Sequence, residues 1–183
     1  MTIAYSFGKR SIATTMALAF LLLVGCNGSS EVSVSYSDSE PDPNFRQFDV
    51  IDTYGNNSEF DPLASLAISP FINDGEFDLF WHIDSDYDYY ADFRINDRPT
   101  LAGSQLVFSE YCNSDFPCHN NQFLYCEYQS DFDVICENSN GDIQVANIGD
   151  QIDTIPQTLY LILDVCDGYG FNCEYQTIPI DFE

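Results

Sequence analysis

Positive charge is almost absent from this chain of 183 residues. It has five lysine and arginine residues against 30 acidic ones, which gives a net charge of −25. Lys9 and Arg10 lie near the amino terminus, so the residues after Cys26 carry three arginines, no lysine and all 30 acids, a net charge of about −27. Such a surface repels phosphate backbones and anionic headgroups, which argues against nucleic-acid binding. We favour a solvated surface suited to salty surroundings over capture of cations or of a basic partner.

Catalytic motifs are also missing. Histidine occurs only at His82 and His119, and no G-x-S-x-G motif accompanies them, so we interpret both as structural. Glycine loops that cradle phosphates are absent. With 30 acids in the chain, some carboxylate pair will always have a glycosidase-like separation, so no particular pair can be singled out. The sequence predicts no catalytic residue and favours a non-enzymatic protein.

Only one long apolar run is present, at residues 11–25 (SIATTMALAFLLLVG), directly after Lys9 and Arg10. A basic segment followed by an apolar run of this length is typical of a secretory signal. It is too short to span a bilayer, which takes about 20 apolar residues. No later stretch approaches that length.

The end of this run has a recognisable order, Leu23-Val24-Gly25-Cys26. It resembles the lipobox of bacterial lipoproteins, which implies cleavage before Cys26 and a lipid on its thiol that holds the chain to a membrane. An ordinary signal with a chance cysteine is the alternative, and it is disfavoured because Cys26 falls where the apolar run stops. Asn27, where inner-membrane members of that family carry Asp, implies the outer membrane of a Gram-negative bacterium.

Composition divides the chain into three parts. Residues 1–25 are the expected signal peptide, and residues 26–44 are rich in Ser, Asp and Pro, which predicts a flexible acidic tether. Residues 45–183 have the size of one domain and hold most of the 15 Phe and 12 Tyr.

Cysteine usage fits an exported protein. Without Cys26, an even six remain: Cys112, Cys118, Cys126, Cys136, Cys166 and Cys173. An even number predicts disulfides, and of the 15 possible pairings the simplest closes three short loops, 112–118, 126–136 and 166–173. A zinc site is disfavoured, since no C-x₂-C pair occurs and export favours oxidation.

Hydrophobic alternation with a period of two dominates from Phe48 onward, and long helical periodicity is absent. Residues 76–97 place alternate apolar side chains on one face, which predicts two antiparallel strands with a turn near Ser85-Asp86. Pro179 suggests that the last strand lies at a sheet edge. Further strands are expected at 48–53, 104–110, 122–128, 133–137, 142–147, 158–166 and 174–182. The pattern predicts an all-β protein, an antiparallel sandwich of roughly eight strands with three local disulfides. This architecture is similar to small extracytoplasmic β-sandwich lipoproteins of aquatic bacteria.

Two groups of oxygen-bearing side chains are weak calcium candidates: Asp84, Asp86 and Asp88, and Asn138, Asn140 and Asp142. The first lacks the Gly and Glu of an EF-hand loop, and strand periodicity explains its acids without a metal. The second has the composition of a tight turn. We therefore expect no cofactor, with millimolar calcium binding as the open alternative.

Aromatic residues cluster at Trp81, Tyr87, Tyr89 and Tyr90. Core packing explains the odd-numbered ones, which leaves Tyr90 for any sugar- or peptide-stacking surface. The expected function is a lipid-anchored binding or envelope-structural module with an unknown protein or glycan partner. The alternative is a hydrolase or carbohydrate-active accessory protein that uses acidic residues.

Overall fold

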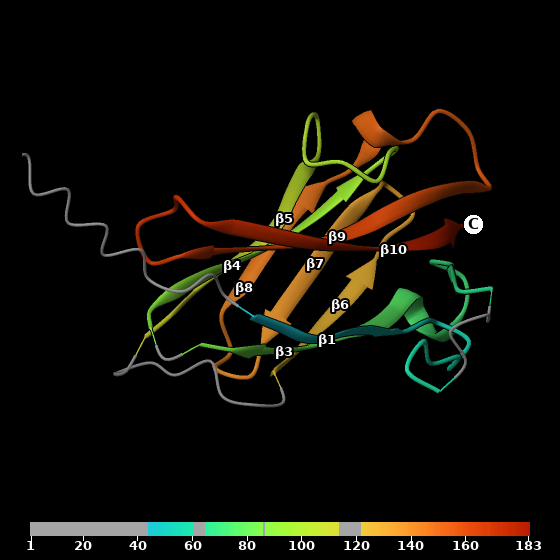
Figure 1. The fold of residues 1–183 in the computed structure, drawn as a ribbon. Helices are drawn as coiled ribbons and strands as arrows, with labels where there is room; N and C mark the ends of the chain where they lie inside the picture. The colour runs from blue at the N-terminus through green and yellow to red at the C-terminus, as the bar shows by residue number, and fades with distance from the viewer. Residues whose placement is uncertain (1–43, 61–64, 86, 114–121) are drawn as a thin grey trace, which may run out of the picture. The chain divides into compact units, whose positions relative to one another are not determined.

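The computed structural model describes residues 44–60, 65–85, 87–113 and 122–183 (Figure 1). The expected signal peptide, Cys26 and the tether up to residue 43 lie outside the described residues, as do Asp86, Cys118 and His119. Within the described part, no helix is long and apolar enough to cross a membrane.

The described residues form two five-stranded sheets, which confirms the predicted all-β class. The first sheet has the order β1 (Asn44–Ile51), β3 (Glu76–Asp84), β6 (Gln122–Tyr128), β7 (Asp133–Asn138) and β8 (Ile143–Asn147). The second has the order β2 (Ala67–Ile68), β10 (Cys173–Phe182), β9 (Gln157–Asp167), β4 (Tyr89–Asn96) and β5 (Gln105–Cys112). Two short 3-10 helices, η1 (Asn73–Gly75) and η2 (Gly149–Gln151), lie in connections. The sequence did not predict β2, because a strand of two residues has no alternation to detect.

Alternating apolar side chains place one face of each sheet in a shared core. Phe77, Leu79 and Trp81 of β3 are buried, and so are Phe93 and Ile95 of β4. Side chains of both sheets belong to one continuous hydrophobic cluster. Because β3 and β4 bury every second residue over most of their length, the other face of each strand is left to solvent.

The prediction that β3 and β4 form an antiparallel pair is wrong. β3 pairs with β1 and β6 in the first sheet, whereas β4 pairs with β5 and β9 in the second (Figure 1). The connection between them therefore passes from one sheet to the other. Alternation shows which face of a strand is buried, but it does not show to which sheet the strand belongs. The odd-numbered residues of β4 would reach the core from either sheet.

Two strand pairs carry disulfides that close the predicted short loops. Cys126 and Cys136 lie opposite each other on β6 and β7, and their bond is formed. Cys166 and Cys173 join β9 and β10 at the hairpin turn. Cys112 is also disulfide-bonded, but its expected partner Cys118 lies outside the described residues.

Pro179 lies where its missing amide hydrogen does no harm. The amides of Asp181 and Glu183 donate to Leu66 and Ile68 beside β2, so the odd-numbered amides at this end of β10 face away from β9. Pro179 has the same parity, and β2 pairs only with Asp181 and Phe182. The prediction that the last strand lies at a sheet edge is thus only partly met, because β2 lies outside β10 in the sheet order and covers Asp181 and Phe182.

A polar clamp joins the two sheets along one side. Gln144 of β8 accepts a hydrogen bond from the backbone amide of Ser109 on β5 at 3.1 Å and donates to its carbonyl at 2.9 Å. The side-chain amide thus satisfies both backbone groups of one residue across the gap between β8 and β5. The pairing fixes the spacing of these two edge strands.

Candidate functional site

The solvent face of the first sheet carries an open groove of about 530 Å³. We call it the acidic groove. Strands β3, β6, β7 and β8 form its floor, and η1 and the turn after β1 form one end. Its lining comprises Ile51, Asp52, Gly55, Asn73, Glu76, Phe77, Asp78, Tyr125, Cys126, Glu127, Ile135, Glu137 and Ile143.

Five of these lining residues are acidic, and none is Lys, Arg or His. Strand register fixes their arrangement, because Glu76 lies directly opposite Glu127, and Asp78 lies opposite Tyr125, which in turn lies opposite Glu137. Like charges in directly opposed positions destabilise a sheet. The groove therefore concentrates negative charge at a cost to folding.

Burial and the Glu76 charge together raise the pKa of the Asp78 carboxyl above its ordinary value, with burial the larger cause. Glu127 has one neutral neighbour, since Gln129 donates a hydrogen bond to its Oε1 at 3.0 Å. A cation in the groove would stabilise the ionised form of the Asp78 carboxyl group.

An aromatic row borders the charges on the same face. The Tyr125 ring lies edge-on to the Phe123 ring, and their centroids are 4.6 Å apart. The centroids of the Phe123 and Phe80 rings are 6.1 Å apart. Tyr125 is 52% exposed, and Ile143 on β8 is 61% exposed. The groove thus offers apolar and aromatic surface between carboxylates, a combination that suits a ligand with both cationic and apolar groups.

Asp52 supports the end of the groove and does not face a ligand. Its Oδ1 accepts the backbone amides of Tyr54 and Asn56, and its Oδ2 accepts the Ala67 amide and the Asn56 side chain. The residue is buried. Both oxygens are thus used to hold the turn after β1 against β2.

The structure gives the first calcium candidates other partners. Asp84 accepts a hydrogen bond from Arg46 at 2.8 Å, which lowers the pKa of its carboxyl. Asp88 accepts one from the Tyr111 hydroxyl at 2.7 Å. Asp86 lies outside the described residues.

The second candidates form the tight turn that their composition allows. Asn138 is buried, and its Oδ1 accepts the amides of Asn140 and Asp142. Its Nδ2 donates hydrogen bonds to the carboxylates of Asp142 and Glu110. Burial is the main cause that raises the pKa of the Glu110 carboxyl group. These side chains line a second hollow of about 420 Å³. The oxygen of Asn138 is therefore engaged by the turn itself.

The cluster expected from the aromatic residues divides between core and surface. Trp81 and Tyr89 are buried as predicted, and burial raises the pKa of Tyr89 to about 12. Tyr87 shares their parity but is exposed, because it precedes β4. Tyr90 lies on the wet face as expected and packs on Tyr111 with ring centroids 4.7 Å apart.

His82 lies on the solvent side of β3, half-buried, as the alternation predicted.

The sequence did not single out the acidic groove. The odd-numbered residues of β6 and β7 contain a detectable pattern, since Tyr125, Glu127 and Glu137 fall on one face. Their alignment with Glu76 and Asp78 depends on strand order, which alternation does not reveal.

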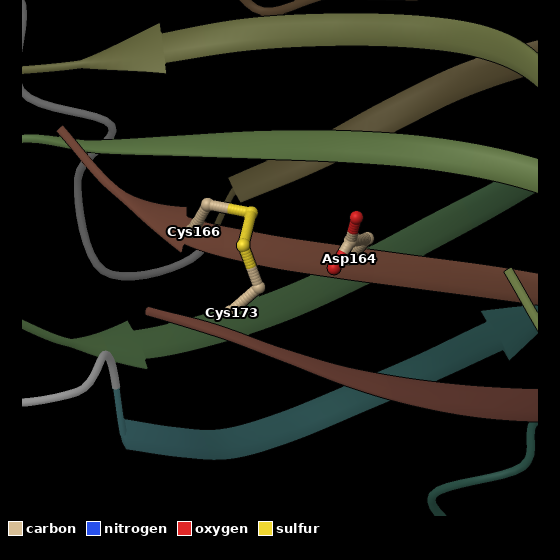
Figure 2. A group of neighbouring side chains, drawn as sticks. All are labelled: Asp164, Cys166 and Cys173. Carbon is tan, nitrogen blue, oxygen red and sulfur yellow. A yellow bond between two sulfur atoms is a disulfide. The ribbon is translucent and has the colours of Figure 1, made fainter. Parts of the chain in front are cut away.

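A different cluster lies on the second sheet. Asp164, Cys166 and Cys173 have ligand atoms that all lie within 4.8 Å of one another (Figure 2). It is the only such group of His, Cys, Asp and Glu among the residues that the structure describes. The two sulfurs are joined in a disulfide.

Comparison with known proteins gives no family for the chain. No family model, no curated protein and no solved structure matches it. The function has to be inferred from the sequence and the geometry of the groove.

Proposed function

We propose that this protein is a lipid-anchored, extracytoplasmic binding module that holds a cationic segment of a partner protein in the acidic groove. The observation that carries the proposal is the opposition of Glu76 and Glu127 beside Asp78 and exposed Tyr125. The opposed carboxylates destabilise the sheet while the groove is empty, so they favour a positively charged ligand. The exposed apolar side chains favour a ligand that has apolar groups between its charges. A basic peptide of alternating character meets both requirements.

A labelled peptide of alternating Lys and Leu is a suitable probe, measured by fluorescence anisotropy against the full-length protein. The groove variant combines Glu76→Gln, Asp78→Asn and Glu137→Gln. At 0.2–1 kcal/mol for each exposed charge pair, we expect it to weaken binding about tenfold. A peptide of alternating Glu and Leu should not bind.

The matched control removes three exposed acids elsewhere, with Asp150→Asn, Asp153→Asn and Glu174→Gln, and has the same net charge as the groove variant. We expect it to bind the Lys-Leu peptide nearly as well as the unaltered protein. Equal weakening in both variants would show that the overall negative field attracts the peptide, and it would overturn the assignment to the groove. So would failure of the unaltered protein to bind.

The anchor part of the proposal is supported by Leu23-Val24-Gly25-Cys26 and by Asn27, which favours the outer membrane of a Gram-negative bacterium. Because the surface is strongly acidic, membrane contact should depend on the lipid and not on the protein surface. In a bacterial host, Cys26→Ser should release the protein from the membrane fraction with its melting temperature unchanged. Retention of the variant in that fraction would contradict the anchor.

A third disulfide, Cys112–Cys118, completes the proposed extracytoplasmic domain. It is supported by the disulfide-bonded state of Cys112 and by the pairing of the four later cysteines among themselves. Peptide mapping without reductant should recover a linked peptide that contains both residues. Recovery of Cys118 as a free thiol would refute this pairing.

Hydrolysis is the second candidate function, and the raised pKa of Asp78 beside ionisable Glu76 is the observation that favours it. Glycoside hydrolysis uses two carboxyl groups, and the one that serves as general acid has a raised pKa. Incubation with mixed oligosaccharides distinguishes the two functions. Product formation that Asp78→Asn abolishes would favour the enzyme, whereas peptide binding without turnover favours the module.

A further inference from the structure

The disulfide between Cys166 and Cys173 is accessible, unlike its counterpart on the first sheet. Cys173 is exposed and Cys166 is half-buried, whereas Cys126 and Cys136 are 4% and 0% exposed. Thiol–disulfide exchange requires a thiolate to reach a sulfur atom. A small thiol reductant should therefore open the bond on the second sheet and leave the other closed.

Asp164 shares a face of β9 with Cys166, because alternate residues of a strand point the same way. Figure 2 shows its carboxyl group beside the disulfide, and the three ligand atoms of Asp164, Cys166 and Cys173 lie within 4.8 Å of one another. After the bond opens, both sulfurs remain neighbours, since their Cα atoms are 4.0 Å apart on directly paired residues.

The Asp164 carboxyl group has an unsatisfied oxygen. Its Oδ1 is buried and has no hydrogen-bond partner in the structure. The Arg94 guanidinium donates through Nη2 to Asp92 at 2.9 Å, and its buried Nε also has no hydrogen-bond partner in the structure. A buried polar atom without a partner calls for an explanation such as a bound ion.

We propose that Cys166, Cys173 and Asp164 form a site for a thiophilic divalent cation of the Zn²⁺ class once a thiol reductant has opened the disulfide. A dithiol attacks Cys173, the S–S bond breaks and Cys166 leaves as a thiolate. The second thiol of the reductant then releases Cys173 and closes a cyclic disulfide, so the reductant loses the two electrons that the protein gains. The metal binds both sulfurs as thiolates, and the protons that they carry as thiols pass to solvent.

Two thiolates and a carboxylate, with water in the fourth position, meet the tetrahedral preference of Zn²⁺ for sulfur, nitrogen and oxygen ligands. In the oxidised protein the sulfurs are not thiolates and cannot ligate in this way. The site therefore exists only in the reduced state. It lies on β9 and β10, away from the strands that line the acidic groove, so its test is independent of the proposed binding function.

The test uses the full-length protein, reduced with dithiothreitol and freed of reductant under nitrogen. Alkylation and mass spectrometry should show Cys166 and Cys173 modified and Cys126 and Cys136 protected. Titration with Zn²⁺ should show one equivalent bound by the reduced protein only. Co²⁺ should give a thiolate-to-metal absorption band.

Asp164→Asn should weaken Zn²⁺ binding roughly tenfold or more, and joint Cys166→Ser and Cys173→Ser should abolish the Co²⁺ band. Glu174→Gln, which removes an exposed acid beside Cys173, is the control and should bind normally. Equal Zn²⁺ affinity in the oxidised protein, a Co²⁺ spectrum without the thiolate band, or an unaffected Asp164→Asn variant would overturn the site. Loss of the β-sheet circular dichroism signal on reduction would also overturn it.

Discussion

Glu76 of β3 and Glu127 of β6 lie directly opposite each other at the edge of the acidic groove. Opposed like charges on neighbouring strands destabilise a sheet by roughly 0.2–1 kcal/mol. Glu76→Gln should therefore raise the free energy of unfolding by an amount in this range, measured in urea at low salt. High salt should reduce the gain, because the repulsion is screened. Glu174→Gln is the control, and a Glu76→Gln variant no more stable than this control would contradict the repulsion.

Asp78 should make stability depend on pH in one direction. Its pKa is raised in the folded protein above the ordinary value of 3.8, so ionisation at neutral pH opposes folding. Asp78→Asn should be more stable than the unaltered protein at about pH 7, and the difference should shrink as the pH falls through the folded pKa of Asp78. Urea unfolding at several pH values measures it. A difference that stays constant with pH would count against this assignment.

Asp167 should act in the opposite direction. Its oxygens accept backbone amides from Tyr169, Phe171 and Asn172 in the β9–β10 turn, and these bonds, led by that from Phe171, lower its pKa. A lowered folded pKa contributes stability above the unfolded value, and that contribution is lost as the pH falls through the folded pKa. Asp167→Asn should therefore destabilise most at neutral pH and least in acid. Equal destabilisation at both would contradict the pKa shift.

Gly75 is expected to tolerate no side chain. Its φ is +79°, and a Cβ atom there would lie 2.2 Å from the backbone oxygen of Tyr128. Gly75→Ala should lower the free energy of unfolding by roughly 2–4 kcal/mol, since backbone strain and a clash add. Gly103 is the matched control, with φ +84° and nothing within 4 Å of a Cβ, so Gly103→Ala should cost only about 1 kcal/mol. Urea unfolding measures both losses. If the two variants lost similar free energies of unfolding, the backbone around Gly75 would have moved to relieve the clash, and the prediction would be wrong.

The sequence was sufficient to predict every strand of this fold except β2, but not which strands are neighbours. Alternation predicted β6 at 122–128 as the structure has it, and cysteine spacing predicted the 126–136 and 166–173 bonds. Such features depend on residues close in the chain. The transfer between sheets after Asp84 depends on which surfaces meet in three dimensions, and odd-numbered residues satisfy the core in either sheet.

The acidic groove was not predicted for the same reason. Asp78 and Glu137 become neighbours of Tyr125 only through the order β3-β6-β7, in which β3 is separated from β6 by two strands of the other sheet. In the sequence each acid is one of 30, and nothing local distinguishes it. Spatial convergence, and not residue type, defines this candidate site.

Pro179 has a consequence for how copies of this protein meet. Among the residues that the structure describes, only β2 pairs with the outer side of β10, through Asp181 and Phe182, and an open strand is a template on which a second chain could add a strand. A strand added there would find no donor at Pro179, so the intermolecular ladder would end before it reached the part of β10 that β2 covers. Carboxylates at Glu174 and Asp181 on the same strand would add repulsion between copies. The part of β10 that β2 does not pair with is thereby protected from edge-to-edge aggregation by proline and by charge.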